Sequence, residues 1–341
     1  MSLTRRAFIP ASLAAAAAAD APRVKIGFLG ASHAHGSTKV KMVLASPRFE
    51  LAGVAEDDPA TRATLEKFGV RLLTREQLLG DAGIQAIAIE SQAKDHARDT
   101  LAALNASKHV HVEKPPADNM KGMREIVALA RRKNLLVQVG YMWRQNPGAN
   151  AVIEAVRKGW LGKVYYVRGS MNINLTPELR RDYALYRGGH MFDLNCHVID
   201  FLVRLMGRPR KVTPFLHSDG GFGDKMNDNT LAVLEWPGAL GVVNGASMRP
   251  NPFLHRSIEV AGSNGTAILA PIEPPALVID LAKPAGPYKA GRNTVRMPAY
   301  VRHQGEFQEL AECITNRKPL SVTLDEDLAV QETLLRACEM R

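Results

Sequence analysis

Cysteine is scarce in this chain of 341 residues, which contains only Cys196, Cys313 and Cys338. Three cysteines this far apart form neither a disulfide framework nor the paired spacing of a zinc site. His33 and His35 are two residues apart, so they would point to different faces of a helix, and no acidic residue accompanies them. We therefore expect free thiols and no metal site.

The sequence also lacks long apolar runs, internal repeats and blocks of one charge. The longest alanine-rich run, residues 7–19, is interrupted by Pro10 and is shorter than the ~20 residues that a spanning helix needs, so we expect no stable membrane span. The net charge of +10 is spread along the chain without a nucleic-acid-binding motif. This pattern excludes nucleic acid as an expected partner and favours a solvated basic surface suited to anionic sugars or polymers.

Residues 1–22 are typical of an export segment rather than of a folded domain. Arg5 and Arg6 form a twin arginine, Phe8 follows, and an alanine-rich stretch ends in small residues before a plausible cleavage position near Ala19. We expect a twin-arginine signal and hence a periplasmic or exported protein. Because that route carries folded cargo, it suits a protein that acquires a cofactor in the cytoplasm.

Apolar runs alternate with helical patterns over residues 23–145. We expect strands at 23–30, 50–58, 84–90, 108–113 and 135–140, with helices between them. This alternation predicts an α/β fold with a doubly wound parallel sheet, a Rossmann dinucleotide-binding domain.

A glycine turn follows the first expected strand. Against the pattern G-x-G-x-x-G, Gly30 keeps the first glycine, whereas Ser32 and His35 occupy the second and third positions. Backbone amides there would approach a pyrophosphate, with His33 or His35 beside the cofactor. Glu56 ends the second strand, where a carboxylate would accept hydrogen bonds from the adenosine ribose and favour NAD over NADP.

Residues 146–341 predict a substrate-binding α+β domain with a large, mostly antiparallel sheet, because short strands are separated by turn pairs such as Asn264-Gly265. One long helix is expected over 187–207. It places Asp193 and His197 four residues apart, on one face. The last two helices are expected to have a packing role only, and the Rossmann domain is one surface onto which they can pack.

Lys114 is the central candidate residue. It follows a strand in the sequence Glu113-Lys114-Pro115, so the amine would lie at the mouth of the sheet, where open α/β sheets bind ligands. A lysine and a histidine that converge on one carbinol make chemical sense, because removal of a hydride requires removal of the hydroxyl proton. We therefore predict Lys114, His197 and Asp193 as the catalytic group, with Asp193 orienting His197.

The ordered set of these motifs resembles the Gfo/Idh/MocA oxidoreductases. The likeness runs from Arg23 to the end and includes Glu-Lys-Pro at 113–115, GGHMFDLNCHVID at 188–200, and the strands GALGVVNGAS and EVAGSNGTAIL. The resemblance implies a Rossmann domain that binds NAD or NADP, with Lys114 beside the nicotinamide and a cis peptide before Pro115. It also implies dimers or tetramers.

Further site residues follow from the resemblance. Ser91, His96 and Glu113 join the expected cofactor site, where Ser91-Gln92 replaces the usual Thr-Pro. Tyr141, Trp143 and Arg144 are expected to line the substrate pocket. Asn195 replaces a glycine between Asp193 and His197 and is expected to bind a substrate hydroxyl.

Three functional hypotheses remain open from the sequence. The first is an NAD(P)-dependent oxidoreductase that acts on a carbinol of a sugar, a polyol or a sugar derivative, with Lys114 and His197 as acid and base. The second is a redox-neutral glycosidase or lyase, or a sugar-sugar oxidoreductase, with tightly bound NAD(P). The third is a non-catalytic carbohydrate-binding protein, suggested by the eroded glycine pattern.

Overall fold

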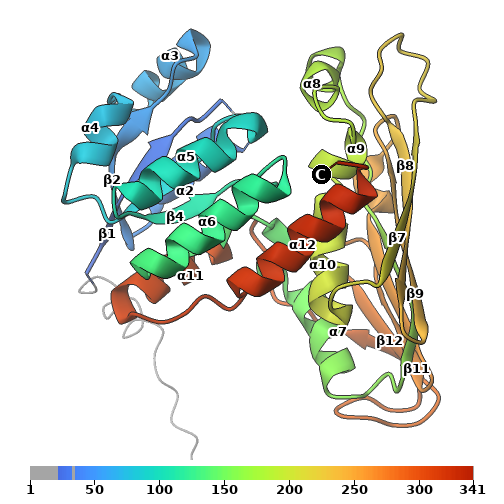
Figure 1. Ribbon diagram of the computed structural model, residues 1–341. Coiled ribbons are helices and arrows are strands. Elements are labelled where there is room, and N and C mark those ends of the chain that lie inside the picture. Colours follow the sequence, from blue (N-terminus) through green and yellow to red (C-terminus); the bar gives the residue numbers. More distant parts are fainter. Residues whose placement is uncertain (1–21, 33–34, 341) are drawn as a thin grey trace, which may run out of the picture.

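The computed structural model describes residues 22–32 and 35–340, which form two domains side by side (Figure 1). The expected twin-arginine segment and His33 lie outside the described residues. Within the described part of the chain, no helix is both long and apolar enough to cross a bilayer.

The amino-terminal domain contains a five-stranded parallel sheet in the order β2-β1-β3-β4-β5, as the sequence predicts. The central strands are buried on both faces, which is why they read as continuous apolar runs. The strands are β1 (Val24–Leu29), β2 (Phe49–Ala55), β3 (Ala86–Ile89), β4 (His109–Val112) and β5 (Val137–Val139).

Helices connect these strands and cover the sheet (Figure 1). They are α2 (Gly36–Ala45), α3 (Pro59–Lys67), α4 (Arg75–Gly80), the short 3-10 helix η1 (Ala93–Asp95), α5 (His96–Asn105) and α6 (Met120–Lys133). The sequence analysis did not anticipate α4. Its signal was present, because Thr74 and Gln77 form a reciprocal capping box at its start.

The second domain is built on an eight-stranded sheet in the order β13-β12-β11-β10-β6-β9-β8-β7. Only β6 and β9 pair in parallel, so the mostly antiparallel prediction is confirmed. The sheet consists of two antiparallel meanders on either side of the β6–β9 pair. The strands are β6 (Val164–Ser170), β7 (Lys211–His217), β8 (Asn229–Trp236), β9 (Ala239–Ala246), β10 (Ser257–Gly262), β11 (Gly265–Leu269), β12 (Leu277–Leu281) and β13 (Gly291–Val295).

Helices lie between this sheet and the Rossmann domain (Figure 1). The contact is close: a β-carbon added at Gly169 of β6 would lie 2.2 Å from a methyl carbon of Val198. The helices that follow β5 are η2 (Met142–Gln145), α7 (Pro147–Arg157), α8 (Pro177–Tyr183), α9 (His190–Asp193), α10 (Cys196–Met206), η3 (Pro252–His255), α11 (Gln304–Asn316) and α12 (Leu324–Ala337). Of these, α11 lies against the Rossmann domain and away from the large sheet (Figure 1).

The prediction of a single helix over residues 187–207 is wrong. Residues 187–189 form a turn in which Gly189 has φ +48°, and the helix is broken between α9 and α10. In a continuous helix the carbonyl of Asp193 would accept from the amide of His197. That amide instead bonds the carbonyl of Leu194, and the Asp193 carbonyl accepts from Lys114 Nζ at 2.7 Å.

The last two helices tie the domains together. Phe307 of α11 packs against the rings of Phe28 and Phe49 in the Rossmann core. The other helix, α12, contacts both α6 and α10. The carboxyl-terminal segment therefore belongs to both domains by contact, although it follows the second domain in sequence.

Candidate active site

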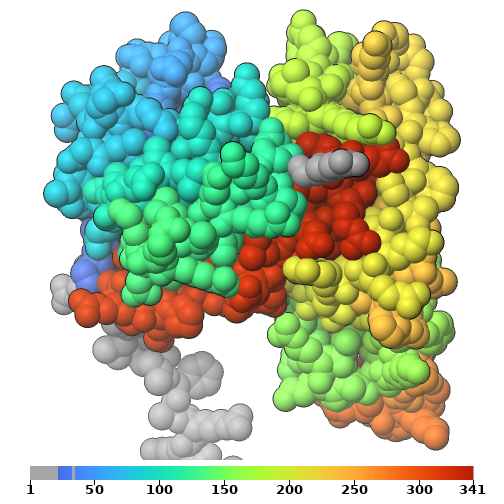
Figure 2. Space-filling model, in the orientation of Figure 1, coloured from blue at the N-terminus to red at the C-terminus, as the bar shows by residue number. Residues whose placement is uncertain are grey.

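A groove runs along the carboxyl ends of the Rossmann strands and consists of two adjoining cavities. The first has a volume of about 690 Å³ and the second about 310 Å³, and Ser32 and Gln92 line both. The second cavity is closed on its far side by residues of α8 and of the segment after it, which form one wall of the notch between the domains in Figure 2. Both volumes lie in the range of small-molecule sites.

The glycine turn forms the floor of the first cavity, the nucleotide cavity. Gly30 has φ +80°, and a β-carbon there would lie 2.7 Å from the backbone of Ser91, so no other residue fits. The helix α2 begins at Gly36 and no described side chain caps its first turn. Its free amides suit a phosphate.

Glu56 lies at the edge of this cavity but holds the loops around it. Its carboxylate accepts from the amide of Ala31 at 2.5 Å and from the amides of Asp57 and Asp58 at 2.9 Å. Asp57 and Asp58 also line the cavity, as does Arg62. The glycine turn, the start of α2 and these carboxylates are the groups that would hold a dinucleotide.

Lys114 lies at the end of β4 and reaches the second cavity, the substrate cavity. The peptide bond to Pro115 is cis, as the resemblance implies. The Nζ atom donates to the carbonyl of Asp193 at 2.7 Å and to its carboxylate at 3.2 Å. Burial alone would lower the pKa of Lys114, but the Asp193 carboxylate together with Cys196 and Glu113 outweighs burial, so the pKa lies above its usual value. The amine is therefore held as an ammonium.

His197 lines the same cavity, but its pKa is shifted in the direction that favours the neutral form. Its ring packs against Tyr141, with centroids 5.8 Å apart, and against Trp143, with centroids 5.7 Å apart. Burial, followed by the charge of Lys114, holds the pKa of His197 well below its usual value. The imidazole is therefore neutral, and its Nδ1 atom is buried without a hydrogen-bond partner among the described residues.

Asp193 does not orient His197 in the way that the sequence analysis expected. The described partners of its carboxylate are Lys114 and the hydroxyl of Tyr183. The helix break explains the difference, because it turns the end of α9 toward the lysine. Asp193 therefore sets the charge and position of Lys114, whereas aromatic packing positions His197.

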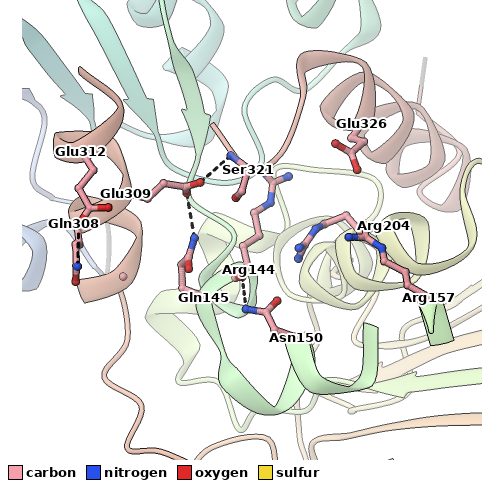
Figure 3. Close-up of a pocket in the computed structure, with 11 residues that line it drawn as sticks. Arg144, Gln145, Asn150, Arg157, Arg204, Gln308, Glu309, Glu312, Ser321 and Glu326 are labelled. Atoms are coloured by element: carbon pink, nitrogen blue, oxygen red, sulfur yellow. Dashed lines mark hydrogen bonds between the residues drawn. The ribbon is translucent and has the colours of Figure 1, made fainter. Parts of the chain in front are cut away.

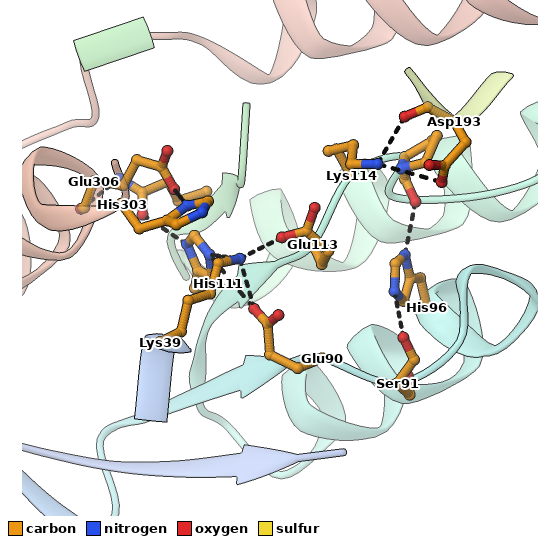
Figure 4. A network of polar contacts seen from close by, with 12 residues as sticks. Lys39, Glu90, Ser91, His96, His111, Glu113, Lys114, Asp193, His303 and Glu306 are labelled. Carbon is orange, nitrogen blue, oxygen red and sulfur yellow. Dashed lines mark hydrogen bonds and ion pairs between the residues drawn. The ribbon is translucent and has the colours of Figure 1, made fainter. Parts of the chain in front are cut away.

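Three expected cofactor residues have other surroundings. His96 is fully buried and bridges the carbonyls of Pro115, at 2.7 Å, and Ser91, at 2.9 Å, so it supports the loops from behind. Glu113 points below the groove, where it bonds Lys39 (Figure 4). His35 lines the substrate cavity and lies 5.2 Å, between ring centroids, from His303.

The network around Lys39 is a buried cluster that sequence reasoning missed. Lys39 donates to Glu90 at 2.7 Å, to Glu113, and to Nε2 of His111 at 3.1 Å (Figure 4). It joins α2 to the ends of β3 and β4. The cluster therefore fixes the strand end that carries Lys114.

The expected substrate residues after β5 lie elsewhere. Met142, not Tyr141 or Trp143, lines the substrate cavity. Arg144 bonds Asp200 at 2.7 Å and Asp327 at 2.6 Å and faces a separate polar cleft (Figure 3).

Asn195 is also displaced from its expected role, because it is fully buried and donates to Thr230 at 3.2 Å. Like Arg144, it is absent from the residues that line the substrate cavity.

The residues that sequence reasoning missed come from α8, from η3 and from the segments that follow helices and strands of the second domain. The substrate cavity is lined there by Tyr183, Tyr186, Phe253, Arg256 and Arg302. They are far apart in the sequence and follow no periodic pattern. Only the tertiary fold brings them to one cavity.

Two family models match the sequence. The oxidoreductase family with an NAD-binding Rossmann fold matches residues 24–141, and the GFO/IDH/MocA C-terminal domain matches residues 150–268. Together they span more than two thirds of the chain.

Individual relatives agree with this assignment. The chain is 26% identical over 254 residues to myo-inositol 2-dehydrogenase of Thermotoga maritima, a match that covers 71% of this chain and 72% of that enzyme. It is 28% identical over 198 residues to trans-1,2-dihydrobenzene-1,2-diol dehydrogenase of Bos taurus, covering 57% of each chain. The chain thus matches little more than half the length of the bovine enzyme.

The fold is shared with a solved structure of aldose-aldose oxidoreductase from Caulobacter crescentus complexed with glycerol. The TM-score is 0.78 at 20% identity, and the match covers 93% of this chain and 98% of that one. The two family models show that the protein belongs to the Gfo/Idh/MocA family of NAD-binding oxidoreductases.

Proposed function

We propose that this protein is an NAD(P)-dependent oxidoreductase that oxidises a carbinol of a sugar, a polyol or a sugar derivative. The family membership and the names of the relatives support this class of reaction. The observation that carries the proposal is the pairing of a charged Lys114 with a neutral His197 on one cavity next to the nucleotide cavity.

The opposite pKa shifts assign the two roles. A neutral imidazole accepts a proton, so His197 takes the proton from the substrate hydroxyl. The Lys114 ammonium donates a hydrogen bond to the same oxygen and stabilises the negative charge that develops there. The sequence left the choice of base open between Lys114 and His197, and the charge states favour His197.

Asp193 is a positioning residue in this scheme. Its carboxylate and its carbonyl both accept from Lys114 Nζ, so the ammonium is fixed in direction as well as in charge. A bound nicotinamide supplies the site that accepts the hydride. In the reverse direction, the protonated His197 returns the proton to the oxygen while Lys114 polarises the carbonyl.

The first test is steady-state NAD(P)⁺ reduction over a panel of sugars, polyols and their derivatives. The variant Lys114→Met should lower kcat/KM by roughly a hundredfold or more, because it removes a charged hydrogen bond made in the transition state. Lys121→Met is the matched control, since the side chain of Lys121 is 87% exposed on α6. Equal turnover by the wild-type protein and Lys114→Met would contradict the catalytic role of Lys114.

A tightly held cofactor would favour the second hypothesis, that of a redox-neutral enzyme. Denaturation of purified protein followed by mass spectrometry of the released nucleotide tests it. Near-stoichiometric NAD(H) or NADP(H), together with glycoside cleavage that consumes no nicotinamide, would replace net oxidation with redox-neutral chemistry. Carbohydrate binding without turnover of any panel member would support the non-catalytic reading.

We further propose that the protein is exported in folded form through its twin arginine. The residues that support this are Arg5, Arg6 and the alanine-rich stretch after them. Cell fractionation of wild type and of the double variant Arg5→Lys, Arg6→Lys tests it. Retention of the variant in the cytoplasm is the expected result, and equal export of both would contradict the proposal.

A further inference from the structure

The substrate cavity contains a buried arginine whose charge is not fully matched. Arg256 lies between η3 and β10, and its side chain is only 4% exposed. Its Nε atom donates to the carbonyl of Asn172 at 3.1 Å, and its guanidinium packs on the ring of Phe253 at 4.2 Å. No other hydrogen bond of this guanidinium is present among the described residues. The side chain lines the substrate cavity.

The nearest carboxylate is already engaged. Glu273, in the loop before β12, forms a two-pronged pair with Arg302, through Nε at 2.6 Å and through Nη2. Arg256 Nη1 lies 3.6 Å from the same carboxylate, beyond hydrogen-bonding distance. Two guanidinium groups therefore share one carboxylate, and one positive charge remains.

The remaining groups of the cavity do not cancel that charge. Lys114 and Asp193 neutralise each other, and His197 is held neutral. Asp182 also lines the cavity, but it is exposed at the rim, where solvent screens it. Burial first, and then repulsion from Arg302, lower the pKa of Arg256 to about 10, in keeping with a cation that lacks a full partner.

We infer that the substrate carries an oxyanion, a carboxylate or a phosphate, which binds Arg256 while its carbinol lies at Lys114 and His197. This inference rests on the proposed function and names its substrate class: an acidic sugar or polyol derivative. A planar guanidinium pairs with either anion through two parallel hydrogen bonds. The aromatic faces of Tyr183, Tyr186 and Phe253, which line the same cavity, suit the carbon skeleton.

Matched compounds test the inference and distinguish the two anions. D-Glucose, D-glucuronate and D-glucose 6-phosphate share a ring and differ at one position, and the galactose series extends the set. Each compound is measured by thermal shift with and without NAD⁺, and by NAD⁺ reduction. The acidic compounds should raise Tm and turn over with lower KM than the neutral parents, and the preferred member identifies carboxylate or phosphate.

Three variants test how the charge of Arg256 affects the binding of acidic compounds. Arg256→Gln should raise KM for the acidic compounds by roughly ten- to a hundredfold, the value of a charge-assisted hydrogen bond, and should raise KM for the neutral compounds by a clearly smaller factor. Arg302→Gln should act in the same direction, because it releases Glu273 to pair with Arg256. Glu273→Gln should lower KM for the acidic compounds. Arg292→Gln, on exposed β13, is the control.

The outcomes separate this inference from the proposed function. If acidic compounds bind in an Arg256-dependent way but nothing is oxidised, the anion site stands and the oxidoreductase proposal falls. If neutral compounds turn over as well as acidic ones, the oxidoreductase proposal stands and the anion site falls. If neither glucuronate, galacturonate nor the sugar phosphates shift wild-type Tm, or if Arg256→Gln affects neutral and acidic compounds equally, the inference is overturned.

Discussion

Lys114 and His197 share one cavity, yet their pKa values move in opposite directions. The difference arises from their partners. Lys114 has a carboxylate to stabilise its charge, whereas His197 is buried and lies near the Lys114 cation, and both burial and that cation disfavour a protonated imidazole. At neutral pH the pair therefore holds one proton donor and one proton acceptor without further adjustment.

This arrangement predicts the pH dependence of turnover. kcat/KM should be flat across neutral pH, fall in acid as His197 becomes protonated, and fall in alkali as Lys114 loses its proton. Asp193→Asn removes the carboxylate that raises the pKa of Lys114, so its alkaline limb should move to lower pH by about 1 to 3 units. Its acid limb should stay within a few tenths of a unit. pH profiles of the two proteins check this, and unchanged alkaline limbs would contradict it.

At the scale of elements, the site depends on how closely two βα loops approach each other. The loop after β1 touches the loop after β3 at Gly30 and Ser91, and His96 joins the latter to Pro115. These contacts explain why the one glycine that this chain retains from the pattern suffices for the turn. Gly30 supplies the close approach, and the open start of α2 supplies the amides.

Gly30→Ala should therefore weaken dinucleotide binding by at least about tenfold, because the left-handed backbone costs roughly 1 kcal/mol or more for alanine and the β-carbon meets Ser91. Fluorescence titration with NADH measures the change in Kd. Gly69→Ala is the matched control, since Gly69 also has positive φ, +68°, but no atom lies within 4 Å of an added β-carbon. Equal Kd values for the two variants would show that the approach to Ser91 is unimportant.

The buried cluster around Lys39 predicts how the stability of the protein depends on pH. Burial first, partly offset by Lys39, raises the pKa of Glu90 to about 8 from the usual value near 4.5. A carboxyl with a raised folded-state pKa contributes stability that is complete below pH ~4.5 and is lost as pH rises through ~8. Wild-type stability should therefore decline from this cause between pH 5 and 9.

Glu90→Gln should remove that component and give a flatter dependence of unfolding free energy on pH. Urea denaturation at pH 6 and pH 9 measures it, with Glu125→Gln, half-exposed on α6, as control. If the unfolding free energy falls equally steeply with pH in Glu90→Gln and in Glu125→Gln, Glu90 does not titrate in this range.

At the scale of the whole molecule, the eight-stranded sheet has helices on one face only (Figure 1). Its other face carries apolar residues in register, including Val233 opposite Val242 and Phe215 opposite Leu231. Leu240 is 53% exposed and Phe215 is 49% exposed. An apolar face of this kind marks an interaction site, and we propose that it pairs with a second copy of the chain.

Light scattering coupled to size exclusion should give the mass of a dimer or tetramer for the wild-type protein. Leu240→Glu should shift the mass toward the monomer, because it places a charge in the apolar contact. Circular dichroism should be unchanged. A monomeric wild-type protein, or a Leu240→Glu variant of unchanged mass, would contradict the proposal.

The sequence by itself determined the two-domain architecture, the parallel sheet and the position of Lys114. Each of these rests on local information: the period of apolar residues, a glycine that the turn requires, and a lysine directly after a strand. Such signals are complete within a few neighbouring residues, so they can be read before the fold is known.

Only the tertiary structure decided the rest of the site. Residues 187–207 were predicted to form one helix, because no local signal shows that the Asp193 carbonyl accepts from Lys114 rather than from the amide of His197. Likewise, Arg144 proved to be held by Asp200 and Asp327, whereas Arg256, distant in sequence, faces the substrate cavity. Charge states, helix breaks and cavity walls depend on partners far along the chain, and folding alone brings those partners together.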